Sequence, residues 1–99
     1  MSETTNTIGR WAVETFGVPT LEVAESRARE EMDELQDAIN LSVYPETIVE
    51  EAADVVIVLC HLAATMDRSL WDAVERKMKT NRQRIWKSRG NGTAQHTED

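Results

Sequence analysis

The feature that most constrains the fold is an uncharged stretch that runs from Val55 to Met66. Its first part, Val55–Leu59, is rich in β-branched residues and alone would suit a buried strand. The apolar character continues without a turn signal, however, and helix-favouring Glu50–Ala53 precede it, so length favours a helix. We expect this helix to cover Glu46 to about Met66, with Pro45 at its start. Apolar side chains surround most of its axis, which requires burial on several sides.

Three more helices are indicated by apolar periodicity and by residues that start and stop helices. They cover Thr7–Phe16, Leu21 to about Asn40, and a stretch that follows Ser69 and ends at about Arg89. Gly17 ends the first, Thr20 caps the second and Ser69 caps the fourth. Residues 1–99 are therefore expected to form one all-α domain, a four-helix bundle. Its ordered core covers about 7–89, and residues 90–99 form a polar tail.

The helix at 46–66 needs more cover than three short neighbours supply. We therefore expect a homo-oligomer with this helix in the subunit interface. Cys60 is the only cysteine, so no intrachain disulfide can form and a reducing compartment is the simpler interpretation. No apolar run approaches the ~20 residues of a membrane span. We expect a cytoplasmic protein without a membrane partner.

Charge is distributed unevenly along the chain. The formal net charge of -7 argues against a protein that coats nucleic acid. Residues 22–54 contain eleven acidic and two basic side chains, whereas residues 68–89 contain eight basic and two acidic ones. A phosphate chain could be gripped between a metal ion in the acidic half and Lys or Arg side chains of the basic half.

Two pairs of acidic residues have the spacing of a metal site built on helices. Glu31 and Glu34 are three residues apart on the second helix, and Glu51 and Asp54 are three apart on the third, so each pair shares one helical face. Helical phase places the first pair at the border of an apolar stripe and the second pair in the only polar wedge of its helix. Four converging carboxylates repel one another unless a hard divalent cation lies between them, and Mg²⁺ or Mn²⁺ would suit.

The acidic pattern also resembles a known family. Glu30-Glu31-x-x-Glu34, sixteen residues and then Glu51-x-x-Asp54 is similar to the signature of the MazG-like all-α nucleoside triphosphate pyrophosphohydrolases. The resemblance implies helical bundles that associate as dimers or tetramers and use Mg²⁺ to cleave between the α and β phosphates. It implies metal binding by four residues, Glu31, Glu34, Glu51 and Asp54. It also implies that Glu30 and Glu50 hydrogen-bond to these ligands or act as the base for the attacking water.

The fourth helix shows a second resemblance, to one branch of this family. Lys77–Trp86, followed by Gly92 and His96, is similar to a phage-associated branch that acts on purine deoxynucleoside triphosphates such as dGTP and dATP. The implied role is control of a nucleotide pool. One residue departs from the family pattern, because many relatives have glycine where this chain has Asp33.

Several residues outside the acidic pairs are candidates for substrate binding. Lys77, Asn81 and Arg84 share one edge of the fourth helix and could contact a triphosphate, although a solvated face would have the same pattern. Trp11 could stack on a base or could pack in the core, and the same alternatives hold for Phe16. His61 lies in the polar wedge of the third helix, where a hydrogen-bonded core histidine is the alternative to a substrate contact.

A second class of function fits the same composition. A non-enzymatic helical interaction module could use its acidic face to bind a basic partner. Such a module would not gain several degrees of melting temperature from Mn²⁺, whereas a preformed metal site would. Metal-dependent stabilisation therefore distinguishes the two.

Overall fold

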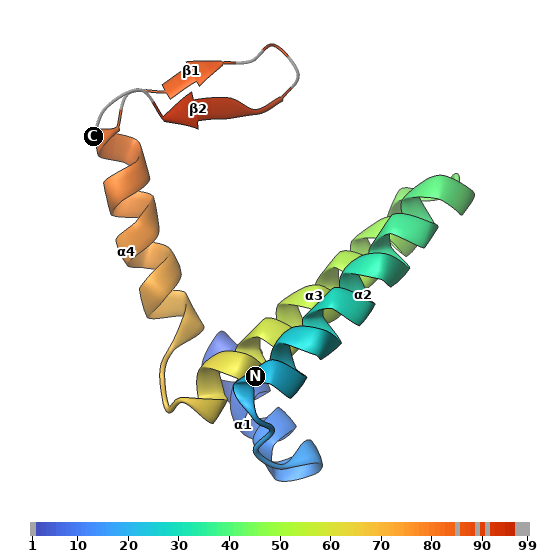
Figure 1. The fold of residues 1–99 in the computed structure, drawn as a ribbon, viewed down its shortest axis with the longest axis vertical. Helices are drawn as coiled ribbons and strands as arrows, with labels where there is room; N and C mark the ends of the chain where they lie inside the picture. Colours follow the sequence, from blue (N-terminus) through green and yellow to red (C-terminus); the bar gives the residue numbers. More distant parts are fainter. Residues whose placement is uncertain (1, 85, 89, 91, 97–99) are drawn as a thin grey trace.

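The computed structural model describes residues 2–84, 86–88, 90 and 92–96, and most of these residues are helical. The chain forms α1 (Thr5–Phe16), α2 (Leu21–Leu41), α3 (Pro45–Thr65) and α4 (Leu70–Gln83), followed by strands β1 (Trp86–Ser88) and β2 (Ala94–His96) (Figure 1). The predicted all-α class with four helices is confirmed. Every predicted boundary of the first three helices agrees with the structure to within two residues.

Side-chain caps define where three of the helices begin. Thr4 accepts a hydrogen bond from the Thr7 amide at 3.1 Å, and Thr7 accepts one from the Thr4 amide at 2.8 Å. This reciprocal cap starts α1 two residues earlier than the sequence indicated. Thr20 accepts from Val23 at the start of α2, and Ser69 accepts from Asp72 at the start of α4, as predicted. Each cap contributes about 1 kcal/mol to helix stability.

The α2 and α3 helices lie side by side as an antiparallel pair, and α1 packs across α3 (Figure 1). Gly9, on α1, allows α1 and α3 to approach closely where they cross. A Cβ atom at this position would come within 2.8 Å of the Ala64 Cβ and 2.9 Å of the Cys60 carbonyl oxygen. The buried core around the two contacts is small, and its fully or nearly buried apolar side chains are Ala12, Ala24, Val58, Cys60 and Ala63.

The α4 helix extends away from the α2–α3 pair (Figure 1). Its contacts are with α1 and α3, near its own beginning, where the Trp71 amide donates to the Thr5 hydroxyl at 3.3 Å. None of its described residues is buried, and the apolar side chains Trp71, Val74 and Met78 are exposed. The apolar side of α4 is therefore little covered within one chain.

The predicted end of the fourth helix was wrong. The helix ends at Gln83 rather than near Arg89, because Arg84 adopts an extended backbone with ψ of 151°. The chain then turns back, with Gly90 and Gly92 both at positive φ, so that β1 pairs antiparallel with β2. Part of the expected polar tail is thus a strand. Arg89, Asn91 and residues 97–99 lie outside the described residues.

Many large apolar side chains remain exposed, and several lie around the turn between α2 and α3. Leu41 is 84% exposed and Val43 is 82% exposed. On α3, Val49 and Val56 lie two turns apart on one face and are both exposed. Within the described residues, none of the helices combines the length and apolar character that crossing a membrane requires.

Candidate metal centre

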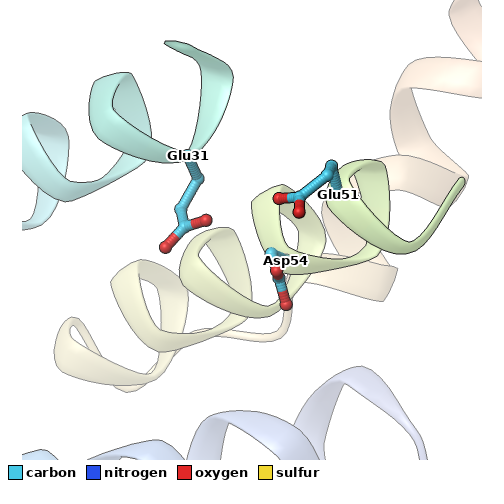
Figure 2. A group of neighbouring side chains, drawn as sticks. All are labelled: Glu31, Glu51 and Asp54. Atoms are coloured by element: carbon cyan, nitrogen blue, oxygen red, sulfur yellow. The ribbon is translucent and has the colours of Figure 1, made fainter. Parts of the chain in front are cut away.

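Three carboxylates from two helices meet between α2 and α3. Glu31 comes from α2, and Glu51 and Asp54 come from one face of α3 (Figure 2). Each residue offers an oxygen atom, and these three oxygens all lie within 4.8 Å of one another. The antiparallel pairing of the helices creates this site, because it places the middle of α2 opposite the first half of α3. The prediction that the two acidic motifs converge is thus confirmed for three of the four residues.

Two oxygen atoms in this centre are buried without a partner. Glu31 Oε2 and Glu51 Oε2 are inaccessible to solvent and have no hydrogen-bond partner in the described part of the chain. An unsatisfied buried carboxylate oxygen is costly, so such atoms require a compensating group. A hard divalent cation is the natural compensator for an all-oxygen donor set. The three acidic residues present could therefore hold a metal ion.

The electrostatics of the centre agree with its geometry. Burial is the main cause that raises the pKa of Glu31, and the neighbouring carboxyl groups of Glu34, Asp54 and Glu51 raise it further. Burial also raises the pKa of Glu51, with added repulsion from Asp54, Glu34 and Glu50. The negative charge of Glu34 thus raises the pKa of one carboxyl group on each helix, Glu31 on α2 and Glu51 on α3. The centre behaves as a concentration of negative charge that a cation would relieve.

The remaining predicted acidic residues border this centre. Glu34 is exposed and, with Glu51, lines an open hollow of about 620 Å³ that extends toward the α2–α3 turn, where Leu41 and Tyr44 also line it. Glu30 and Glu50 are both exposed, each next in the chain to a member of the centre. Glu50 contributes to the raised pKa of Glu51.

An aromatic corner lies where the turn after α1 meets α3. Trp11 is 52% exposed and contacts Phe16 edge to face, with ring centroids 5.4 Å apart. Phe16 in turn lies 6.0 Å from the His61 ring. His61 is only 5% exposed, and its Nε2 is 2.8 Å from the Gly17 carbonyl oxygen. His61 is therefore the hydrogen-bonded core histidine, whereas Trp11 remains half exposed.

The three predicted substrate residues of the fourth helix lie apart from the centre within one chain. Lys77 and Asn81 belong to α4, and Arg84 caps its end. Among the described elements α4 contacts α1 and α3 but not α2 (Figure 1). The single chain therefore does not bring these residues together with the carboxylates, and their role stays a prediction.

Sequence reasoning missed Arg27. Its guanidinium carbon lies 5.3 Å from the centroid of the Phe16 ring, a cation–π distance. A signal was present in the sequence, because Arg27 is one of only two bases in residues 22–54 and precedes Glu31 by one helical turn.

Comparisons with protein-family models, with curated proteins and with solved structures gave no match to this chain. The resemblance of the acidic motif to the MazG-like family therefore depends on the motif residues alone, and the function must be argued from the centre itself.

Proposed function

We propose that this protein is a divalent-cation-dependent pyrophosphohydrolase that converts a nucleoside triphosphate to the monophosphate and pyrophosphate. The observation that carries the proposal is the pair of buried, unpartnered oxygens of Glu31 and Glu51, in a group with Asp54 in which one oxygen from each residue lies within 4.8 Å of the others. The MazG-like pattern of the same residues supplies the reaction and the substrate class. The resemblance of Lys77–Trp86 to the phage-associated branch favours a purine deoxynucleotide such as dGTP or dATP.

Different acidic residues would have different roles in this reaction. Glu31, Glu51 and Asp54 would hold Mg²⁺ or Mn²⁺, with Glu34 beside them. When bound, the ion would polarise the phosphoanhydride and make a nearby water more acidic. Glu50, which is exposed and next in the chain to Glu51, would accept the proton of that water, and Glu30 is the second candidate base. Water is added across the bond between the α and β phosphates, and pyrophosphate leaves.

We also propose that the protein acts as a homodimer or homotetramer. The apolar side of α4 and the uncharged outer face of α3 are both exposed in the single chain. Packing between subunits would cover these faces, and it could bring α4 of one subunit to the acidic centre of another. Lys77, Asn81 and Arg84 would then contact the triphosphate, as the sequence predicted.

The test is a panel of ribo- and deoxynucleoside triphosphates, incubated with Mg²⁺ or Mn²⁺, with identification of the products. We expect a monophosphate and pyrophosphate, with the highest rate for a purine deoxynucleotide. Release of orthophosphate and a nucleoside diphosphate would show that a different bond is cleaved. Absence of hydrolysis for every triphosphate would favour the interaction module.

Substitution of Asp54 tests the metal ligands. Asp54→Asn should reduce turnover by more than about 100-fold, since even residues that only orient metal ligands cost 10–100-fold when they are removed. Asp33→Asn is the matched control, because Asp33 is an exposed acid on α2 outside the centre. Far-ultraviolet circular dichroism should be the same for both variants. Normal turnover by Asp54→Asn would refute the ligand assignment.

A further inference from the structure

We propose that Arg27 binds a phosphate group of the nucleotide, on the side of the α2–α3 pair that carries both the acidic centre and the aromatic corner formed by Trp11, Phe16 and His61. The proposal rests on the proposed function, because it assumes that the centre takes a nucleoside triphosphate. It adds a residue that lies on the same chain as the carboxylates, one turn along α2 from Glu31.

The aromatic contacts place Arg27 on a definite side of the α2–α3 pair. Phe16 lies 5.3 Å from the guanidinium carbon of Arg27 and 6.0 Å from the ring of His61. Arg27 belongs to α2 and His61 to α3, so Phe16 spans the two helices on one side. The hydrogen bond between His61 and the Gly17 carbonyl fixes the turn after α1 against this side.

Helical phase places the acidic centre on the same side. Arg27, Glu31 and Glu34 follow one edge of α2 at spacings of four and three residues, and the rise from Arg27 to Glu31 is about 6 Å. On α3, Asp54 and His61 are seven residues apart and share one edge. A nucleotide could therefore extend from the carboxylates, past Arg27, to the exposed face of Trp11.

Arg27 is also free to bind an anion. It precedes Glu30 and Glu31 by three and four residues, spacings at which ion pairs form on helices. The single ion pair among the described residues is nevertheless Arg29 with Glu25, at 3.1 Å, and no described hydrogen bond involves Arg27. A guanidinium that stacks on a ring keeps its in-plane N–H donors available. Phe16 therefore contacts the guanidinium of Arg27 without neutralising its charge.

The negative charge of the centre explains why a nearby cation would favour binding of a triphosphate. A triphosphate approaching Glu31, Glu34, Glu51 and Asp54 meets concentrated negative charge even when a divalent ion is bound. A guanidinium on the approach path would offset the repulsion and orient the phosphate chain by two parallel hydrogen bonds. The alternative is that Arg27 only covers Phe16, in which case its removal would change stability and not affinity.

The test compares Arg27→Gln with the matched control Arg29→Gln. Both substitutions remove one arginine charge from α2, but Arg29 pairs with Glu25 on the opposite, exposed side of the helix. We would measure KM and kcat for the preferred triphosphate. Calorimetry would give the affinity for Mn²⁺ alone and for an analogue with a methylene group between the α and β phosphorus atoms. Thermal unfolding would report stability.

For Arg27→Gln we expect KM and the Kd of the analogue to rise by about tenfold, the effect of losing one charge-assisted contact. The affinity for Mn²⁺ should change less than about twofold, since no ligand is removed, and Arg29→Gln should match wild type throughout. Arg27→Lys, which keeps the charge but not the planar fork, should recover part of the lost affinity. It also keeps the test informative if the glutamine variant unfolds.

Two results would overturn the proposal in different ways. If Arg27→Gln lowers the melting temperature but binds the analogue as wild type does, Arg27 is only a cover for Phe16. If the wild-type protein binds Mn²⁺ but neither binds the analogue nor hydrolyses any triphosphate, the proposed function itself has failed.

Discussion

At the scale of single residues, the carboxylates of the centre depend on which side of each helix faces the other, because Glu31 Oε2 and Glu51 Oε2 are both buried. Helical phase distinguished Glu31 and Glu34 from the other acidic residues of α2, since the spacing of apolar residues indicates which side faces α3. The positions of Glu51 and Asp54 followed in the same way. Phase puts Arg27 on the same edge of α2 as Glu31, but its contact with Phe16 from another helix could not be predicted from the sequence. Contacts between distant segments leave no period in the sequence.

The raised pKa values give the first prediction at this scale. The carboxyl groups of Glu31 and Glu51 have an ordinary pKa of 4.5, and burial with neighbouring negative charge raises both in the folded state. Between pH 4.5 and the raised pKa values, the folded protein therefore binds more protons than the unfolded chain. The free energy of unfolding should decrease as pH rises through this window when no divalent cation is present. Urea unfolding at a series of pH values in chelator measures it.

One variant and one added cation distinguish the contribution of Glu31 and Glu51 to this pH dependence from that of the other titrating residues. Glu51→Gln should show a shallower decrease across the same pH window, because its side chain cannot ionise. Mn²⁺ at 100 times its Kd should stabilise the wild-type protein by about 2.7 kcal/mol at neutral pH, and Glu51→Gln should lose most of this gain. Equal pH slopes for wild type and variant, with no response to Mn²⁺, would mean that the carboxylates do not interact.

At the scale of helices and strands, the sequence predicted the helix ends that are determined by neighbouring residues. The caps at Thr20 and Ser69 and the stop at Gly17 are encoded by neighbouring residues, and the structure confirmed them. The end of α4 is different. Trp86 pairs with His96 across a turn, so the strand depends on a partner ten residues away. Gly90 and Gly92 follow the predicted end of the helix, and their positive φ values turn the chain back into a hairpin.

The crossing of α1 and α3 leads to a prediction for Gly9. Glycine to alanine inside a helix normally stabilises by about 1 kcal/mol. Here the added methyl group would meet the Ala64 Cβ at 2.8 Å and the Cys60 carbonyl oxygen at 2.9 Å, and a backbone atom cannot move aside cheaply. Gly9→Ala should therefore destabilise the protein, by about 1–3 kcal/mol as for other overpacked sites. Chemical denaturation measures the change.

A second substitution on the same helix controls for helix propensity. Asn6→Ala changes an exposed position of α1 and should be neutral or stabilising. If Gly9→Ala were as stable as Asn6→Ala, the two helices would have to cross at a larger separation than the structure gives.

At the scale of the whole molecule, the amount of exposed apolar surface calls for a partner. The described chain buries few apolar side chains, and most of its larger ones are on the surface. A chain with so small a core is expected to gain much of its stability from association. The sequence indicated this through the apolar circumference of the third helix, but it could not specify which face meets a second subunit. Of the exposed positions, Val49 and Val56 form a face of α3 without charge.

Association through α3 is the prediction at this scale. Light scattering coupled to gel filtration should give two or four times the 11.2 kDa of one chain. Val56→Glu should shift the mass toward that of the monomer, since Val56 is half exposed and a buried unpaired carboxylate would be costly in the interface. Gln36→Glu adds the same charge at an exposed, already polar position of α2 and should leave the assembly unchanged. The single chain brings no α4 residue to the carboxylates, so a monomeric Val56→Glu should also lose triphosphate hydrolysis while still binding Mn²⁺. A monomer that hydrolyses triphosphates at the wild-type rate would show instead that the carboxylates, Arg27 and the aromatic corner of one chain form a complete site.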